Sequence, residues 1–159
     1  MSIWAPLLTR WSIGVEFTKD DVMPVLHFTL AYWCVLVAAM LPIVCAGISK
    51  WRQFGKPLKE GGFDNRHPRD WLARQTDWRA RANAAQANSF EALPFFIGAV
   101  VIAHQLGAYQ MRLDILAFVY VVLRLVYITL YVANQANLRS LVWTLALATN
   151  IAILFSGYR

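Results

Sequence analysis

The sequence predicts an all-α integral membrane protein, built as an antiparallel bundle of four transmembrane helices. Of its 159 residues, 58% are hydrophobic and only 15% are charged, whereas about 25% of the residues in a typical soluble domain are charged. The apolar residues gather into four stretches with the length that a membrane span requires. Short polar connections between the later stretches favour up-down-up-down connectivity. We therefore expect a single membrane domain over residues 1–159, with no separate soluble module.

The four spans are expected at residues 22–48, 76–106, 114–132 and 138–155, with a polar loop at residues 49–75. This loop is rich in Gly, Pro and charged residues, which break regular structure and keep the segment in water. A helix is expected to start just after Pro68 and to project several polar turns before it enters the bilayer near Phe90. A tight turn at residues 107–113 and a short connection at residues 133–138 separate the last three spans.

The positive charge of the chain is concentrated in the polar loop. The net charge is +6, and nine of the fifteen Lys and Arg residues lie between Lys50 and Arg81. Such a balance can indicate nucleic-acid binding, but a basic cluster between spans follows the positive-inside rule. We therefore expect membrane lipid and no nucleic acid as a partner, with the loop in the cytoplasm and both termini on the opposite side of the membrane.

The second span carries a polar stripe where it enters the bilayer. Arg81, Asn88 and Glu91 are separated by steps of seven and three residues, so they share one helix face. A carboxylate within an apolar span is costly and normally faces a protein interior or a wet cavity. Glu91 is therefore either part of a functional site or one half of an ion pair that ties helices together, and both interpretations can hold.

The third span carries a matching stripe. Arg124, Tyr127 and Tyr131 are spaced three and four residues apart and also share one face. Because Glu91 is the only acidic residue in the apolar part of any expected span, we expect a direct ion pair between Arg124 and Glu91.

The sequence offers no pattern for a metal site or a catalytic thiol. Cys34 and Cys45 lie eleven residues apart on the first span, which separates them by roughly 16 Å along a helix axis. His67 has no Cys or His at metal-ligand spacing. Any reactive sulfur is therefore expected to arrive with a substrate.

These stripes resemble those of the MAPEG family, the membrane-associated proteins in eicosanoid and glutathione metabolism. The resemblance covers residues 78–143 and rests on two groups of residues. The first group, on the second span, is Arg81, Asn88, Glu91 and Pro94. The second group comprises Arg124, Tyr127 and Tyr131 on the third span and the pair Arg139 and Ser140 at the start of the fourth.

The resemblance implies a homotrimer with glutathione sites between neighbouring subunits, near the cytoplasmic ends of the helices. Glutathione is then a thiol co-substrate, and the implied function is a transferase or peroxidase that acts on lipophilic electrophiles from the bilayer, in a bacterial inner membrane. By this resemblance Arg139 is the catalytic residue that hydrogen-bonds the sulfur and favours the thiolate. The residues implied to bind glutathione are Arg81, Asn88, Glu91, Arg124, Tyr127, Tyr131 and Ser140.

Two positions depart from the family pattern. Ala84 stands where glutathione-using members carry an arginine, and Ala87 stands where some of them carry another. Arg74, Arg79 and Arg81 are the nearby candidates to replace them. One alternative is therefore a non-catalytic or differently liganded member of the family.

A small proton-coupled multidrug transporter is the other alternative. A fixed arginine that neutralises Glu91, together with a basic mouth that repels cations, argues against it.

Overall fold

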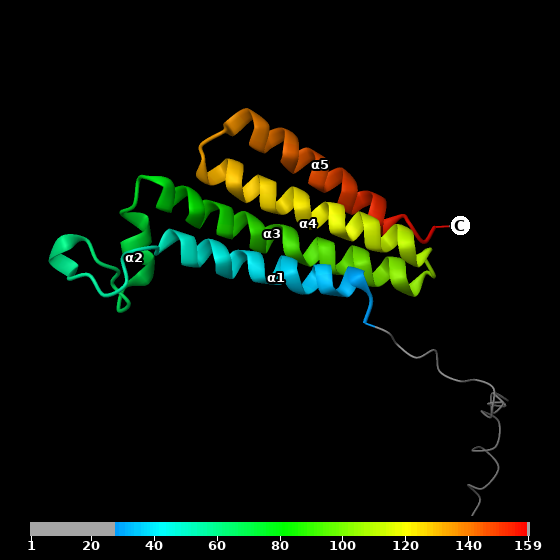
Figure 1. The fold of residues 1–159 in the computed structure, drawn as a ribbon, viewed down its shortest axis with the longest axis horizontal. Coiled ribbons are helices and arrows are strands. Elements are labelled where there is room, and N and C mark those ends of the chain that lie inside the picture. Colours follow the sequence, from blue (N-terminus) through cyan, green and yellow to red (C-terminus); the bar gives the residue numbers. More distant parts are fainter. Residues whose placement is uncertain (1–27, 159) are drawn as a thin grey trace, which may run out of the picture.

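The protein is a bundle of long antiparallel helices (Figure 1). The computed structural model describes residues 28–158. Within this range, four helices are long and apolar enough to cross a membrane: α1 (Leu30–Ser49), α3 (Trp78–Gln105), α4 (Gln110–Val132) and α5 (Ala136–Leu154). The loop between α1 and α3 holds the 3-10 helix η1 (Leu58–Glu60) and the short helix α2 (Pro68–Ala73). The predicted all-α, four-span fold is confirmed.

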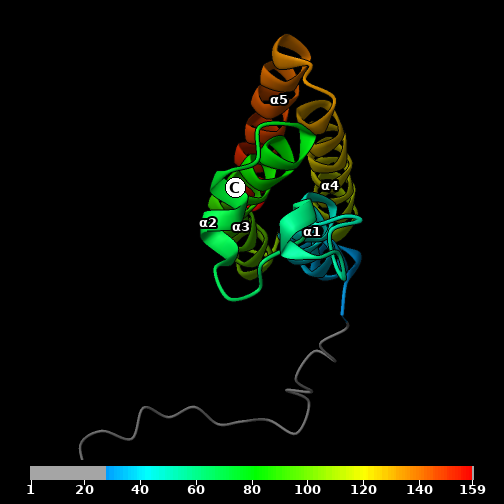
Figure 2. The ribbon, with the colours of Figure 1, turned by 90° about the vertical axis from the view of Figure 1, so that its left-hand side faces the viewer.

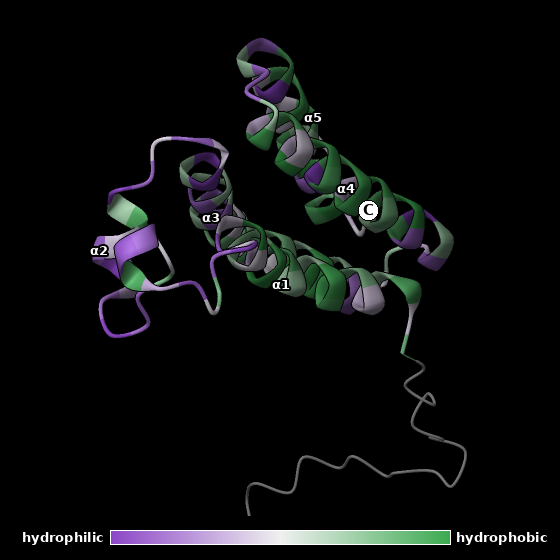
Figure 3. Ribbon diagram, turned by 60° about the vertical axis from the view of Figure 1, so that its left-hand side comes forward, coloured by the Kyte–Doolittle hydropathy of each residue, from purple (hydrophilic) through white to green (hydrophobic). Residues whose placement is uncertain are grey.

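The helices α3 and α4 form the middle of the bundle, with α1 packed on one side of them and α5 on the other (Figure 2). The α1–α3 loop and the α4–α5 turn lie at one end of the bundle, and the α3–α4 turn lies at the other end (Figure 1). Polar residues dominate the loop, whereas the four long helices are largely apolar (Figure 3). This separation matches a bundle that crosses the bilayer and exposes the loop to water.

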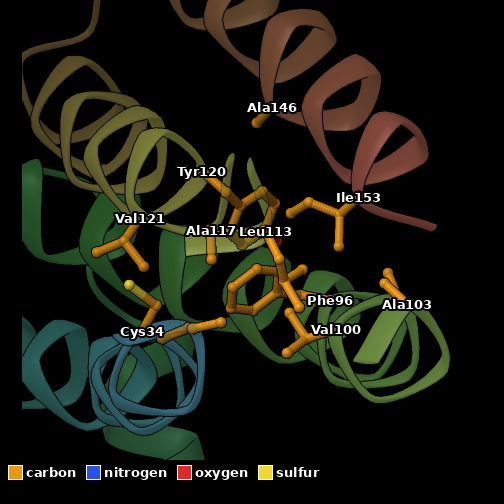
Figure 4. Close-up of a cluster of buried hydrophobic side chains, with 13 residues drawn as sticks. Cys34, Phe96, Val100, Ala103, Leu113, Ala117, Tyr120, Val121, Ala146 and Ile153 are labelled. Atoms are coloured by element: carbon orange, nitrogen blue, oxygen red, sulfur yellow. The ribbon is translucent and has the colours of Figure 1, made fainter. Parts of the chain in front are cut away.

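Small residues and one aromatic stack form the core. In the main core cluster, four alanines on three helices are at most 1% exposed: Ala31, Ala99, Ala103 and Ala117. Small side chains of this kind allow helix backbones to approach closely within a membrane. The rings of Phe96 and Tyr120 stack with their centroids 4.0 Å apart, and Ile153 of α5 lies beside them (Figure 4). The core therefore joins all four long helices.

The start of the first span differs from the prediction. The span was expected to begin at residue 22, and residues 22–27 lie outside the described range. Within that range, Phe28 and Thr29 are not helical and α1 begins at Leu30. An Asp114 carboxylate oxygen on α4 accepts the backbone N–H of Ala31 at 2.8 Å. This N–H is one of the unpaired donors of the first helical turn, so a residue from another helix caps α1.

The third span also starts earlier than expected, at Gln110 rather than residue 114. The side-chain amide of Gln110 donates to Asp114 at 2.8 Å. Gly107, with φ of +69°, reverses the chain after α3, and glycine adopts this left-handed conformation at little cost. The turn is therefore shorter than predicted, and Asp114, which caps α1, lies one turn inside α4.

The helix expected to run on from Pro68 is interrupted. Helix α2 ends at Ala73, and α3 begins separately at Trp78. Asp77 caps α3, because its carboxylate accepts the backbone N–H of Arg79 at 2.9 Å, and a capping aspartate has non-helical backbone angles. The predicted polar extension of the second span is therefore wrong upstream of Trp78, although the expected span boundary near residue 76 is close.

The polar loop is folded around Trp71. This residue is buried, its indole N–H donates to the carbonyl of Gly61 at 3.3 Å, and the ring of Phe63 packs edge-on against it at 5.2 Å. A Cβ at Gly62 would lie 2.0 Å from the carbonyl oxygen of Lys56, so this position requires glycine. The loop is therefore an ordered cap on one end of the bundle.

We propose that this loop faces the cytoplasm, because its basic residues follow the positive-inside rule. A reporter that is active only in the cytoplasm should give signal when it is inserted at Gly61 and none when it is fused after Arg159. The opposite pattern of activity in intact cells would contradict this orientation.

Candidate functional site

The polar stripes of α3 and α4 meet at Arg124, which is 3% exposed although it carries a charge. One terminal nitrogen of its guanidinium donates to the Asn88 side-chain oxygen at 3.0 Å, and the other donates to the Ser89 hydroxyl at 3.1 Å. The guanidinium also lies over the Tyr127 ring, 4.6 Å from its centroid. Neutral oxygens and an aromatic face therefore satisfy this buried cation.

The predicted ion pair between Arg124 and Glu91 is wrong. Within residues 28–158 the ion pairs are His67 with Asp70 and Arg79 with Asp77. Glu91 lies three residues beyond Asn88, roughly 4.5 Å farther along the helix axis, and its side chain is exposed. Because Asn88 and Ser89 lie at the level of Arg124, they take both terminal nitrogens.

Ser89 is a partner that the sequence analysis missed. Its hydroxyl donates to the carbonyl of Ala85 at 2.8 Å, which leaves its oxygen lone pairs free to accept from Arg124. Serines in membrane helices commonly bond back to their own backbone in this way. The residue type alone therefore carries no signal that distinguishes a partner of an arginine from an ordinary helix serine.

A second polar group surrounds Arg139 at the start of α5. The Arg139 guanidinium lies over the Tyr131 ring, 4.2 Å from its centroid, and Tyr131 packs edge-on against Tyr127 at 5.6 Å. These three residues line an open groove of about 460 Å³, together with Ser140, Trp143 and Thr144. The structure thus brings Arg139 and Ser140 together with the tyrosines of α4.

Three of the other predicted residues line a separate cavity of about 190 Å³ between α3, α4 and α5. Asn88, Glu91 and Arg124 contribute to its lining, and none of them lines the Arg139 groove. Trp143 is shared by both spaces. Within one chain, the predicted site is therefore divided into a groove and a cavity that meet at one indole ring.

Arg81 lies outside both spaces. Its Nε donates to the carbonyl of Val132 at 2.9 Å, which is one of the unpaired carbonyls at the C-terminal end of α4. Its two terminal nitrogens make no hydrogen bond to residues 28–158. Arg81 therefore ties α3 to α4 and keeps part of its guanidinium available to a ligand.

Asn150 and Trp143 also line these spaces, although the sequence analysis did not select them. Asn150 is a strongly polar residue in an apolar span, and the same signal identified Glu91 and Arg124. Trp143 carries no comparable signal, because tryptophans are frequent at membrane interfaces for reasons unrelated to function.

Truncation of Asn88 should expose its coupling to Arg124. We expect Asn88→Ala and Arg124→Leu to be non-additive in denaturant unfolding in mixed micelles, with a coupling energy of about 1 to 2 kcal/mol, since the hydrogen bond has a charged donor within a membrane domain. Glu91→Ala should instead add to Arg124→Leu. Additive losses for the Asn88 pair, or strong coupling for the Glu91 pair, would contradict these contacts.

Comparison with family models identifies the family of the chain. The model of the MAPEG family matches residues 30–158, which include all four spans and every predicted site residue. Comparisons with curated proteins and with solved structures find no match. The family match covers most of the chain, and we conclude that the protein belongs to the MAPEG family of multi-pass membrane proteins.

Proposed function

We propose that the protein is a glutathione-dependent transferase or peroxidase that acts on lipophilic electrophiles dissolved in the bilayer. The observation that carries this proposal is the groove in which Arg139 lies over Tyr131 beside Ser140. Arg139 has no carboxylate partner within residues 28–158. Its positive charge is therefore available to an anion that enters the groove.

A guanidinium in this position favours ionisation of a thiol. A free thiol with a pKa near 8.5 is mostly protonated at neutral pH, and a nearby fixed cation lowers that pKa and raises the thiolate fraction. The Ser140 hydroxyl donates to the carbonyl of Ala136 at 3.1 Å, so its lone pairs remain free to accept a hydrogen bond. Arg139 would orient and stabilise the sulfur, and Ser140 would help to hold the thiol before ionisation.

The remaining polar groups fit a tripeptide with two carboxylates and an ammonium group only in part. Glu91 is an exposed carboxylate without an ion-pair partner in the described chain, which suits an ammonium group. Arg81 offers its terminal nitrogens to a carboxylate. Arg79 is paired with Asp77 and lies over the Trp78 ring, so it does not replace the arginines absent at Ala84 and Ala87.

A differently liganded family member is the competing proposal, and the two alanines favour it. With fewer cations near the groove, carboxylate recognition is weaker than in a chain with arginines at these positions. Calorimetry with glutathione on the purified protein in detergent separates the two proposals, because a differently liganded member shows no binding at millimolar concentration.

Arg139→Ala should remove most turnover with a model electrophile while glutathione affinity stays within a few-fold of the wild type. The expected reason is that the charge acts on the sulfur, whereas other residues hold the tripeptide. The ultraviolet absorbance of the bound thiolate should fall in parallel. Arg139→Lys should restore part of the rate, since an ammonium keeps the charge but lacks the planar fork.

Thr144→Val provides a matched control, since Thr144 lines the same groove but its hydroxyl donates to the backbone carbonyl of Ser140. Turnover at the wild-type rate in Arg139→Ala would contradict the role of Arg139, and Tyr127 or Tyr131 would be the next residue to replace.

We also propose that the chain assembles as a homotrimer. Glu91 is exposed on a single chain although it lies within the apolar part of α3, and a carboxylate that faces lipid is costly. A neighbouring subunit that covers this face removes the cost and completes the site.

Analytical ultracentrifugation in a density-matched detergent should therefore give a protein mass close to three times 18.1 kDa. A Glu91→Lys variant should dissociate more readily if a neighbouring subunit covers this position. A monomeric wild-type protein would contradict the proposed trimer.

A further inference from the structure

Asp114 is a carboxylate at the start of a membrane span with no cation paired to it. It lies one turn inside α4, and among residues 28–158 no basic side chain forms an ion pair with it. One of its oxygens, Oδ1, accepts both the backbone N–H of Ala31 and the side-chain amide of Gln110, each at 2.8 Å. The other oxygen, Oδ2, accepts no hydrogen bond from this part of the chain. Asp114 therefore keeps an unbalanced charge and a free oxygen, which are costly within a span unless a partner approaches.

Asp114 lines a groove of about 630 Å³ at the end of the bundle opposite the polar loop (Figure 1). Leu30 lines this groove from α1, and its other lining residues belong to α4 or to the residue before it. The walls are otherwise mostly apolar. The groove shares no lining residue with the Arg139 groove or with the cavity that Glu91 lines. It is therefore separate from the proposed glutathione site.

An apolar stripe continues from this groove along the outside of α4. Its exposed side chains follow one another at steps of four and three residues, so they share one helix face. They are Met111, Ile115, Phe118, Val122 and Leu125. The stripe is roughly 21 Å long, which exceeds the depth of one leaflet of the hydrocarbon core, about 15 Å. One acyl chain of a lipid can therefore lie along it.

The groove and the stripe together indicate the chemistry of the ligand. A carboxylate without a counter-charge selects a cation, and its free oxygen selects a cation that donates a hydrogen bond. A primary ammonium carries three N–H donors, as in a lysine side chain, whereas the quaternary ammonium of choline carries none. The apolar walls favour a molecule that also brings a hydrocarbon chain.

We propose that this groove binds an aminophospholipid, with its ammonium group on Oδ2 of Asp114 and one acyl chain along the stripe. The interaction balances the charge of Asp114 with that of the head group and covers apolar side chains with hydrocarbon. Binding does not depend on glutathione chemistry, because the two sites have no residue in common.

Photolabelling with three head groups tests this site. The protein in phosphatidylcholine nanodiscs receives a small share of a lipid with a diazirine in its acyl chain and an ethanolamine, dimethylethanolamine or choline head group. All three head groups are zwitterionic, but only the first two can donate an N–H. These two lipids should label the peptide that contains Ile115 and Phe118 about two- to twelve-fold more than the choline lipid, which corresponds to the net effect of one hydrogen bond.

Asp114→Asn separates lipid binding from the cap on α1. Both internal hydrogen bonds converge on Oδ1, so the amide oxygen of an asparagine can accept them, and the melting temperature should stay close to that of the wild type. The substitution replaces the other oxygen by an NH₂ group, which cannot accept from an ammonium. The variant should therefore be labelled equally by all three lipids.

Asp70→Asn is the matched control, because it removes the same charge from the exposed helix α2 of the polar loop. This variant should keep the preference of the wild type for the two donor lipids.

Equal labelling of the wild type by the three lipids would overturn the proposal. A gradual fall from ethanolamine through dimethylethanolamine to choline would overturn it as well, because it would show selection by the size of the head group. A preference retained by Asp114→Asn would place the selectivity elsewhere in the protein. Free ethanolamine should displace the lipid no more than free choline at equal ionic strength, and stronger displacement would indicate a site for small amines instead of a lipid.

Discussion

The burial of the Arg124 guanidinium constrains how α3 and α4 can pack. A cation in an apolar span cannot be left without hydrogen-bond acceptors, and its acceptors Asn88 and Ser89 both belong to the other helix. Two further contacts lie on the same helix pair: Arg81 with Val132, and Phe96 with Tyr120. Residue numbers rise along α3 as they fall along α4 through these three contacts, as an antiparallel pair requires. The polar contact and the aromatic stack therefore specify one register.

Neutral acceptors satisfy this cation without cancelling its charge. The amide of Asn88 and the hydroxyl of Ser89 complete the hydrogen bonding of Arg124, while Glu91 keeps its own charge at the edge of the same cavity. A direct ion pair would use both charges within the protein and leave little for a ligand. In the observed arrangement, the Arg124 guanidinium and the Glu91 carboxylate instead line the same cavity between α3, α4 and α5. Arg124 therefore does not neutralise Glu91, and it is the basic loop that opposes binding of a cationic substrate.

Composition and periodicity predict the four spans, their order and the two polar stripes, because apolar length and helical spacing are local properties of a sequence. The remaining features depend on contacts between distant residues. The start of α1 is set by Asp114 from α4, 83 residues away, and the break before α3 is set by the Asp77 cap rather than by Pro68. The choice of acceptor for Arg124 depends on an axial offset of a single helical turn, and spacing along one helix cannot reveal the offset between two.

Helix α5 carries a third stripe of the same kind. Arg139, Trp143, Ala146 and Asn150 follow one another at steps of four, three and four residues, so they share one face of the helix. This face supplies the guanidinium of the groove, the indole that groove and cavity share, and the amide at the far end of the cavity. Arg139 and Asn150 are separated by roughly 16 Å along the axis. One helix face therefore connects the Arg139 groove with a buried amide in the later, apolar part of α5.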